Sequence, residues 1–290
     1  MSTNKVTDQA EGLRRILAGQ TSRTMAFLSA VPVDLKNAVL LNLATSLAKA
    51  NSEVQLLDAC QSPQGISVGT PPHLPQTLWD VVQERCSTEA AILEHSPGVH
   101  IVKLAEQSLA SLVQQPEQPE QSENLDKLDQ LLKATFKASS FSLVDTDIDH
   151  DNALVLPQLA AAEMVVLVTV TTESIKNAYA LVKTVHAQLG LRTFSMLVVG
   201  ATPAKANLIQ QNMGIAANQY LGVKLVSLGC IPPDEQLSRS SHVGRAMVEA
   251  YPMSPAAVAF RALAGRLIDN IAAPQLSVKP KPKTKTGVAA

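Results

Sequence analysis

The sequence predicts an α/β fold of three layers, a mostly parallel sheet flanked by helices on both faces. Short aliphatic runs alternate with segments of helical period along most of the 290 residues. The short runs are apolar throughout rather than at every second position, which is typical of strands buried on both faces. Hydrophobic residues make up 46% of the chain and aromatic residues only 3%, so we expect a large aliphatic core.

Seven runs are expected to form strands. They are residues 25–29, 54–57, 99–104, 141–144, 164–170, 193–199 and 224–228. The helical segments between and after them are most evident at residues 35–50, 123–138, 172–189 and 254–271. In the last of these, Ser254 is a suitable N-cap and Pro255 suits the first helical position.

Composition narrows the class of protein. The net charge of −1 gives no global field that would favour nucleic acid. The cysteines, Cys60, Cys86 and Cys230, are far apart and lack metal-binding spacing, which is typical of free thiols in a reducing compartment. There is no apolar leader and no apolar stretch of roughly 20 residues, so we expect a cytoplasmic protein.

The sequence divides into three predicted parts. Residues 1–22 form an N-terminal segment, residues 23–273 one domain, and residues 274–290 a tail rich in lysine and proline. We expect the tail to be disordered because it has little to bury. Its lysines offer at most a weak contact with anionic lipid at the inner membrane, because bulky apolar anchors are lacking.

The connection after the first predicted strand carries the sharpest signal. Residues 29–37 read Ser-Ala-Val-Pro-Val-Asp-Leu-Lys-Asn, at the place where a nucleotide-binding α/β protein has a glycine-rich phosphate loop. Such a loop needs glycines so that backbone N–H groups can converge on the phosphates. Here glycine is absent, and Pro32 removes one N–H and fixes φ. The strand–loop–helix frame is kept while the phosphate cradle is missing.

The chain resembles the MinD/ParA class of deviant P-loop ATPases, and within it the flagellar-number regulators of FlhG/FleN type. Several motifs carry this resemblance, because they occur in the order and at the spacing of that family. The resemblance covers about residues 8 to 270. It lies in Asp8-Gln-Ala-Glu-Gly-Leu-Arg-Arg, residues 27–47, Val54-Gln-Leu-Leu-Asp-Ala, Leu143-Val-Asp-Thr, residues 161–169, Leu228-Gly-Cys-Ile-Pro, and Val248-Glu-Ala-Tyr-Pro-Met-Ser-Pro followed by residues 256–263.

The resemblance implies a vestigial nucleotide site made of Lys36, Asn37, Asp58 and Asp145. The family loop superposes on residues 29–37 without a gap, and its phosphate-binding lysine survives as Lys36. Asn37 stands where the family has its magnesium-binding hydroxyl. Asp58 matches the first aspartate of the family's Asp-x-Asp switch, and Asp145 matches the aspartate on the magnesium side.

Other family positions have changed. The signature lysine of the deviant loop falls on Val31, the second switch aspartate on Cys60, the switch glycine on Asp147 and the adenine-reading asparagine on Gly200. Phosphoryl transfer depends on positioning and charge neutralisation around the phosphates. We therefore expect a pseudo-ATPase that needs no cofactor, with ATP and magnesium bound only if an alternative holds. That alternative is an active, atypical ATPase of the same class, in partitioning or polysaccharide export.

Two of the retained residues, Lys36 and Asp145, also have a plainer interpretation. For Lys36 we favour a solvated lysine in the first turn of a helix. For Asp145 a carboxylate that caps the turn after its strand competes evenly with a residual metal role. The short run Asp149-His-Asp is more simply a solvated loop than a metal site, because neighbouring residues point in different directions.

The N-terminal motif is the place where the resemblance puts function. Asp8, Gln9, Leu13, Arg14 and Arg15 match the family's helix that engages and stimulates the flagellar GTPase related to the signal-recognition particle. The competing interpretation is a short amphipathic helix that only caps its own domain. We expect a regulatory protein of flagellar placement or assembly that is a monomer or an ATP-independent dimer.

Overall fold

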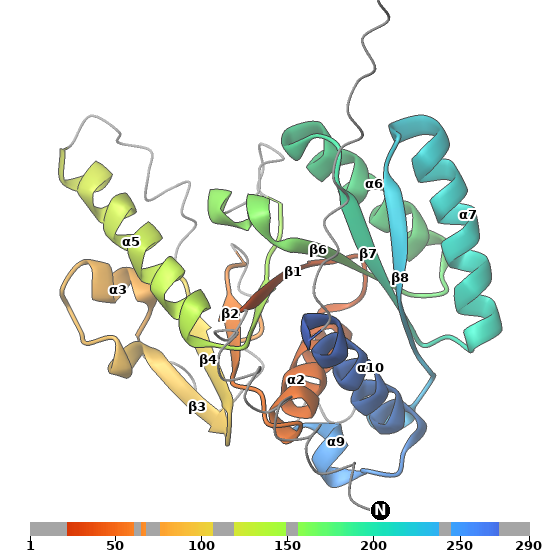
Figure 1. The fold of residues 1–290 in the computed structure, drawn as a ribbon, viewed down its shortest axis with the longest axis horizontal. Helices are drawn as coiled ribbons and strands as arrows, with labels where there is room; N and C mark the ends of the chain where they lie inside the picture. Colours follow the sequence, from red (N-terminus) through yellow and green to blue (C-terminus); the bar gives the residue numbers. More distant parts are fainter. Residues whose placement is uncertain are drawn as a thin grey trace, which may run out of the picture.

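An eight-stranded sheet forms the middle layer of the fold, as Figure 1 shows. The computed structural model describes residues 22–60, 65–67, 76–106, 119–148, 156–237 and 245–272. The strands lie in the order β3-β4-β2-β5-β1-β6-β7-β8, and all neighbouring pairs are parallel except β3 and β4. Their bounds are β1 (Arg23–Ser29), β2 (Val54–Asp58), β3 (Ile92–Ser96), β4 (Val99–Lys103), β5 (Phe141–Asp145), β6 (Glu163–Val168), β7 (Thr193–Val199) and β8 (Lys224–Ile231).

Helices cover both faces of this sheet. One face carries α3 (Leu78–Val82), α5 (Pro119–Ala138), α6 (Thr172–Leu189) and α7 (Pro203–Leu221). The other carries α2 (Val33–Lys49), α9 (Met247–Ala250) and α10 (Pro255–Ala272). Two short 3-10 turns, η1 (Glu89–Ala91) and η2 (Pro157–Ala161), precede β3 and β6. The predicted three-layer class is confirmed.

Strand side chains alternate between the two helical layers. In β1, Ala26 and Leu28 pack toward the α5 and α6 side, whereas Met25 and Phe27 pack toward α2 and α10. All four are fully buried. A strand covered on both faces needs apolar residues at consecutive positions, which is why the aliphatic runs identify the strands so well.

Strand β3 and helix α7 are among the elements that the sequence signals miss. Strand β3 reads Ile-Leu-Glu-His-Ser and lies antiparallel at a sheet edge, so it has neither an apolar run nor a clean alternation. Helix α7 buries a thin stripe, but Leu208 and Ile215 are exposed on it and blur its helical period. The predicted start of α10 is confirmed, since the Ala257 N–H donates to Ser254 Oγ at 3.3 Å.

Helix α2 is the most enclosed helix of the second layer. Its residues 36–47 are all buried between the sheet and helices α9 and α10. Asn42, fully buried, donates to the Ala38 carbonyl at 2.7 Å and accepts from the Val248 N–H at 2.9 Å. This side chain ties α2 to α9 and fixes the helix that begins at the candidate site.

Within the described part of the chain, the helices are too short or too polar to span a bilayer.

Candidate functional site

The carboxyl ends of β2, β5 and β1 lie side by side and define the candidate site. Asp58 ends β2 and Asp145 ends β5, and the two are direct partners in the parallel register. Strand β1 pairs on the other side of β5 and leads into α2. In open α/β sheets, binding sites lie outside the carboxyl ends of such strands, where successive connections diverge.

The connection from β1 to α2 is short, and two of its N–H groups are bonded within the protein. The Ala30 N–H donates to the Leu167 carbonyl at 3.1 Å, and the Val31 N–H donates to Ser29 Oγ at 3.3 Å. Helix α2 begins at Val33, and the Lys36 N–H already donates to the Pro32 carbonyl at 2.9 Å. Residues 33–35 are therefore the first turn of a helix and not a loop that curls around an anion.

Lys36 does not extend into solvent. Its side chain is 7% exposed, and Nζ lies 2.7 Å from Asp145 Oδ2 and 3.5 Å from Cys60 Sγ. The predicted solvated lysine is therefore wrong. The physical reason is that α2 packs over the ends of β2 and β5, where two buried carboxylates require a nearby cation. Lys36, Asp58, Cys60 and Asp145 are called the Lys36 cluster below.

Backbone groups also bind the two carboxylates, although Asp145 Oδ1 is buried without a hydrogen-bond partner among the described residues. Asp58 accepts from the N–H groups of Cys60 and Ser67, each at 3.1 Å, and from the Ser67 hydroxyl. Asp145 accepts from the Ile66 N–H at 3.0 Å. The interpretation of Asp145 as a cap of its own following turn is wrong, because its carboxylate binds Lys36 and a residue remote in sequence.

Electrostatics in the Lys36 cluster favour a charged pair beside a neutral thiol. Burial raises the pKa of Asp145 to about 6, although Lys36 opposes the rise. Burial alone would lower the pKa of Lys36, but the neighbouring Asp145 carboxylate reverses this and the pKa is raised. Burial, reinforced by Asp145, raises the pKa of the Cys60 thiol. At pH 7 the cluster thus holds an ammonium–carboxylate pair and a protonated Cys60.

The donor atoms of Asp58, Cys60 and Asp145 lie within 4.8 Å of one another, close enough to surround one cation. The Lys36 ammonium already contacts two of these residues. The cation that the geometry supplies is therefore part of the chain itself. Magnesium prefers an all-oxygen set, and a neutral thiol in place of a carboxylate is a poor ligand for it.

The structure brings together Lys36, Asp58 and Asp145 as the sequence predicts, with Asn37 next to Lys36 on α2. Asn37 is buried, and its Oδ1 has no hydrogen-bond partner in the part of the chain that the structure describes. Asp8, Gln9, Leu13, Arg14 and Arg15 lie outside the described residues, as does the run 149–151.

Sequence reasoning missed the segment Gly65-Ile66-Ser67, which contacts both aspartates. An added Cβ at Gly65 would lie 2.0 Å from Asp58 Oδ1 and 2.1 Å from Oδ2. The available signal was a glycine followed by a β-branched residue and a serine, within a stretch read only as loop. The glycine permits the close approach that Ile66 and Ser67 need.

Solved structures share this fold at low sequence identity. MinD in the MinC:MinD cell division complex of Aquifex aeolicus matches with a TM-score of 0.62 and 17% identity, over 86% of this chain and 96% of MinD. A ParA family ATPase from Chlorobium tepidum matches with a TM-score of 0.62 and 18% identity, over 86% of this chain and 99% of its own. The chain therefore has the fold of the MinD and ParA class of P-loop proteins.

Curated sequences give the closer placement. Antiactivator FleN of Pseudomonas aeruginosa is 30% identical over 238 residues, which cover 80% of this chain and 81% of FleN. The chain belongs to the FleN family. An uncharacterized ATP-binding protein of Methanocaldococcus jannaschii is 26% identical over 235 residues, or 80% of this chain and 83% of that protein. No protein-family profile matches the chain.

The approach of Gly65 to Asp58 predicts a position-specific glycine effect. Gly65→Ala should destabilise the fold by about 1–3 kcal/mol, because the Asp58 carboxylate is held by Cys60 and Ser67 and cannot move aside freely. Gly214→Ala is the matched control: it lies in α7 with open space around it and should stabilise by about 0.5–1 kcal/mol. Urea unfolding measures both, and equal effects would contradict the packing described.

The buried ion pair predicts a non-additive mutant cycle. Lys36→Met should destabilise by about 3–5 kcal/mol, because it leaves a buried carboxylate without its cation. Adding Asp145→Asn should restore part of the loss. Lys49→Met, which breaks the more exposed pair with Glu249, should cost about 0–1 kcal/mol.

Chemical denaturation at pH 7 measures Lys36→Met, Asp145→Asn, the double variant and Lys49→Met. A loss in Lys36→Met no greater than that in Lys49→Met would show that the pair has no structural role.

Proposed function

We propose that this chain is a FleN-type regulatory protein whose nucleotide site is vestigial and which acts through protein contacts rather than ATP turnover. The observation that carries the proposal is the position of the Lys36 ammonium, buried against Asp145 and Cys60. In a working phosphate site this lysine must reach the β- and γ-phosphates. Here it binds the Asp145 carboxylate at the carboxyl ends of the strands.

Three features argue that a magnesium triphosphate does not fit the residues present. The segment after β1 is wound into the first turn of α2, so its amides do not curl around a phosphate. Asp34 places an exposed carboxylate in that same turn, which repels a polyphosphate. Cys60, with its raised pKa, stands where the family implies a second switch aspartate.

The proposed partner is a flagellar GTPase of the signal-recognition-particle type, engaged by the N-terminal motif. In this proposal Gln9 orders the catalytic water of the partner, and Arg14 or Arg15 lies near the phosphates of its GTP. The support comes from the sequence motif and from membership of the FleN family. Stimulating another enzyme in this way requires no chemistry in the Lys36 cluster.

A second candidate function is an atypical ATPase, in partitioning or polysaccharide export. The buried Asn37 Oδ1 favours it, because a polar atom with no partner among the described residues leaves room for a ligand contact. The Methanocaldococcus jannaschii relative is also named as ATP-binding. We rank this function second because the same site would need Lys36 to leave a buried ion pair.

A thermal-shift measurement with magnesium and ATP separates the two functions. Saturation at 100 times Kd would stabilise a binding protein by about 2.7 kcal/mol. We expect no change in Tm and no ATP-dependent dimer in sedimentation, relative to magnesium chloride at equal ionic strength. A saturable rise in Tm with ATP that adenosine does not produce would support the ATPase.

The N-terminal motif predicts a loss of GTPase stimulation. With the flagellar GTPase of the same genome, Gln9→Ala should lower the stimulated rate of GTP hydrolysis by about tenfold or more. The reason is that the attacking water loses the side chain that orders it. Gln20→Ala, in the same segment but outside the motif, is the matched control and should leave the rate unchanged. A pulldown tests whether binding persists. Unchanged stimulation by Gln9→Ala would refute the catalytic role and favour the capping interpretation.

A further inference from the structure

Strand β8 has the composition of an interior strand but lies at the open edge of the sheet. It is eight residues long and reads Lys-Leu-Val-Ser-Leu-Gly-Cys-Ile. Leu225 and Cys230 pack toward the α7 layer, and Leu228 toward the α10 layer. Val226 remains 37% exposed. A long apolar edge strand of this kind is a template for pairing with another segment.

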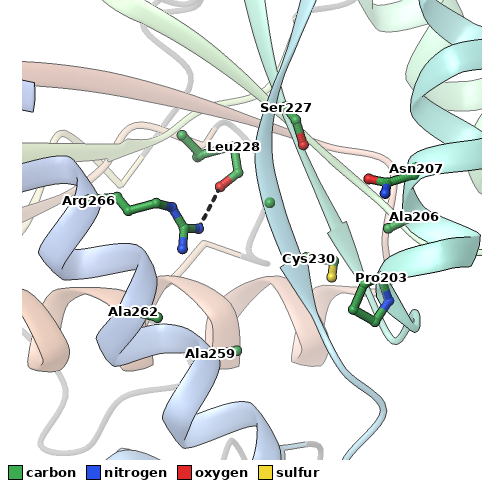
Figure 2. Close-up of a pocket in the computed structure, with 10 residues that line it drawn as sticks. Pro203, Ala206, Asn207, Ser227, Leu228, Cys230, Ala259, Ala262 and Arg266 are labelled. Atoms are coloured by element: carbon green, nitrogen blue, oxygen red, sulfur yellow. Dashed lines mark hydrogen bonds between the residues drawn. The ribbon is translucent and has the colours of Figure 1, made fainter.

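A groove of about 500 Å³ runs along this edge between the two helical layers. Helix α7 forms one wall, α10 the other, and residues 227–230 of β8 the floor, as Figure 2 shows. Half of the wall residues are alanines, namely Ala206, Ala259 and Ala262. Small walls leave room for an extended backbone beside β8.

Arg266 lies over the floor of the groove. The pairing of β7 and β8 shifts between Met196 and Leu197, which leaves Leu228 as an extra residue in β8. Gly229 follows with φ of +121°, and an added Cβ there would lie 2.8 Å from Arg266 Nη2. Arg266 Nη2 donates to the Leu228 carbonyl at 3.1 Å (Figure 2).

The charge of the groove is unbalanced. Arg266 is exposed and is the one charged side chain among the residues that line the groove. In the described ranges, no carboxylate lies within 4.0 Å of its guanidinium. A guanidinium binds a carboxylate by two parallel hydrogen bonds, and one of its nitrogens is now held only by a neutral carbonyl.

We propose that this groove is a docking site for an extended acidic segment of a partner protein. The segment adds to β8 as a further strand and places an Asp or Glu side chain on Arg266. Backbone hydrogen bonds to the edge supply affinity, and the carboxylate fixes the register. The residues that line this groove belong neither to the Lys36 cluster nor to the N-terminal motif.

The chain's own tail is a poor occupant. Residues 273–290 contain four lysines and no aspartate or glutamate. The Leu267 carbonyl accepts from Arg23 at the start of β1. Helix α10 therefore ends near the amino ends of the parallel strands. A parallel strand after α10 would need a crossover on the face opposite α7, which is the rare left-handed connection.

A second copy of the chain is also a poor occupant. Pairing β8 with β8 across a two-fold axis would bring two Arg266 side chains into one edge, and neither strand carries an acidic residue. Like charges in such an interface are destabilising. An acidic segment from a different protein is the occupant that satisfies the groove.

Peptide selection on the full chain tests the proposal. Random 12-residue peptides on phage are selected against the immobilised protein, and the winners are synthesised for affinity and hydrogen-exchange measurements. We expect β-branched peptides with an acidic residue at one fixed position. These peptides should slow amide exchange in residues 225–230, and Arg266→Gln should weaken them about tenfold or more.

Variants give the controls. Arg261→Gln, exposed on α10 but outside the groove, should leave peptide affinity unchanged, and Arg266→Glu should reverse the preference to peptides with lysine. Circular dichroism checks that each variant is folded, and Arg266→Lys should keep part of the affinity because it keeps the charge.

Several results would overturn the proposal. These are winners without acidic preference, equal affinity for Arg266→Gln, or exchange protection away from β8. Tighter peptide binding after deletion of residues 273–290 would assign the groove to the tail. A dimer that Val226→Lys dissociates in sedimentation would assign it to a second copy.

Discussion

The buried contact between Lys36 and Asp145 constrains how the chain is arranged at the carboxyl ends of the parallel strands. Asp145 is fully buried at the end of β5, and its partner in register, Asp58, is buried at the end of β2. Two carboxylates this close in a dry environment require a positive charge and several N–H donors. Lys36 supplies the charge, while Cys60, Ile66 and Ser67 supply N–H groups. Helix α2 must then begin early enough to carry its fourth residue over that edge.

Topology explains why these residues meet. Parallel strands end at the same side of a sheet, and the order β2-β5-β1 puts the chain that enters α2 next to the two aspartates. The same doubly covered sheet leaves β8 at its outer edge, where α7 and α10 rise on both sides. A site at the strand ends and a groove at the strand edge are thus separate products of one architecture.

Much of the fold could be predicted from residue order because strands buried on both faces have unbroken aliphatic runs. Strand β3 and helix α7 could not, since an edge strand with Glu94 and a helix with exposed Leu208 lack a clean period. At the site, the motif identified Lys36, Asp58 and Asp145 but placed Lys36 in solvent. Local sequence cannot reveal that burial, because it depends on Asp145, more than a hundred residues away, and on the packing of α2. The contacts of Gly65 escaped for the same reason.

Lys36 has one further consequence for how such a protein would be controlled. A bound metal nucleotide exchanges with the cell and so reports on its energy supply, whereas an ammonium group on a side-chain tether cannot leave. Under the proposed function, a regulator neutralised in this way would have no off state set by hydrolysis. Its regulatory activity would then depend on the amount of the protein in the cell. Synthesis and proteolysis would be the steps at which that activity is controlled.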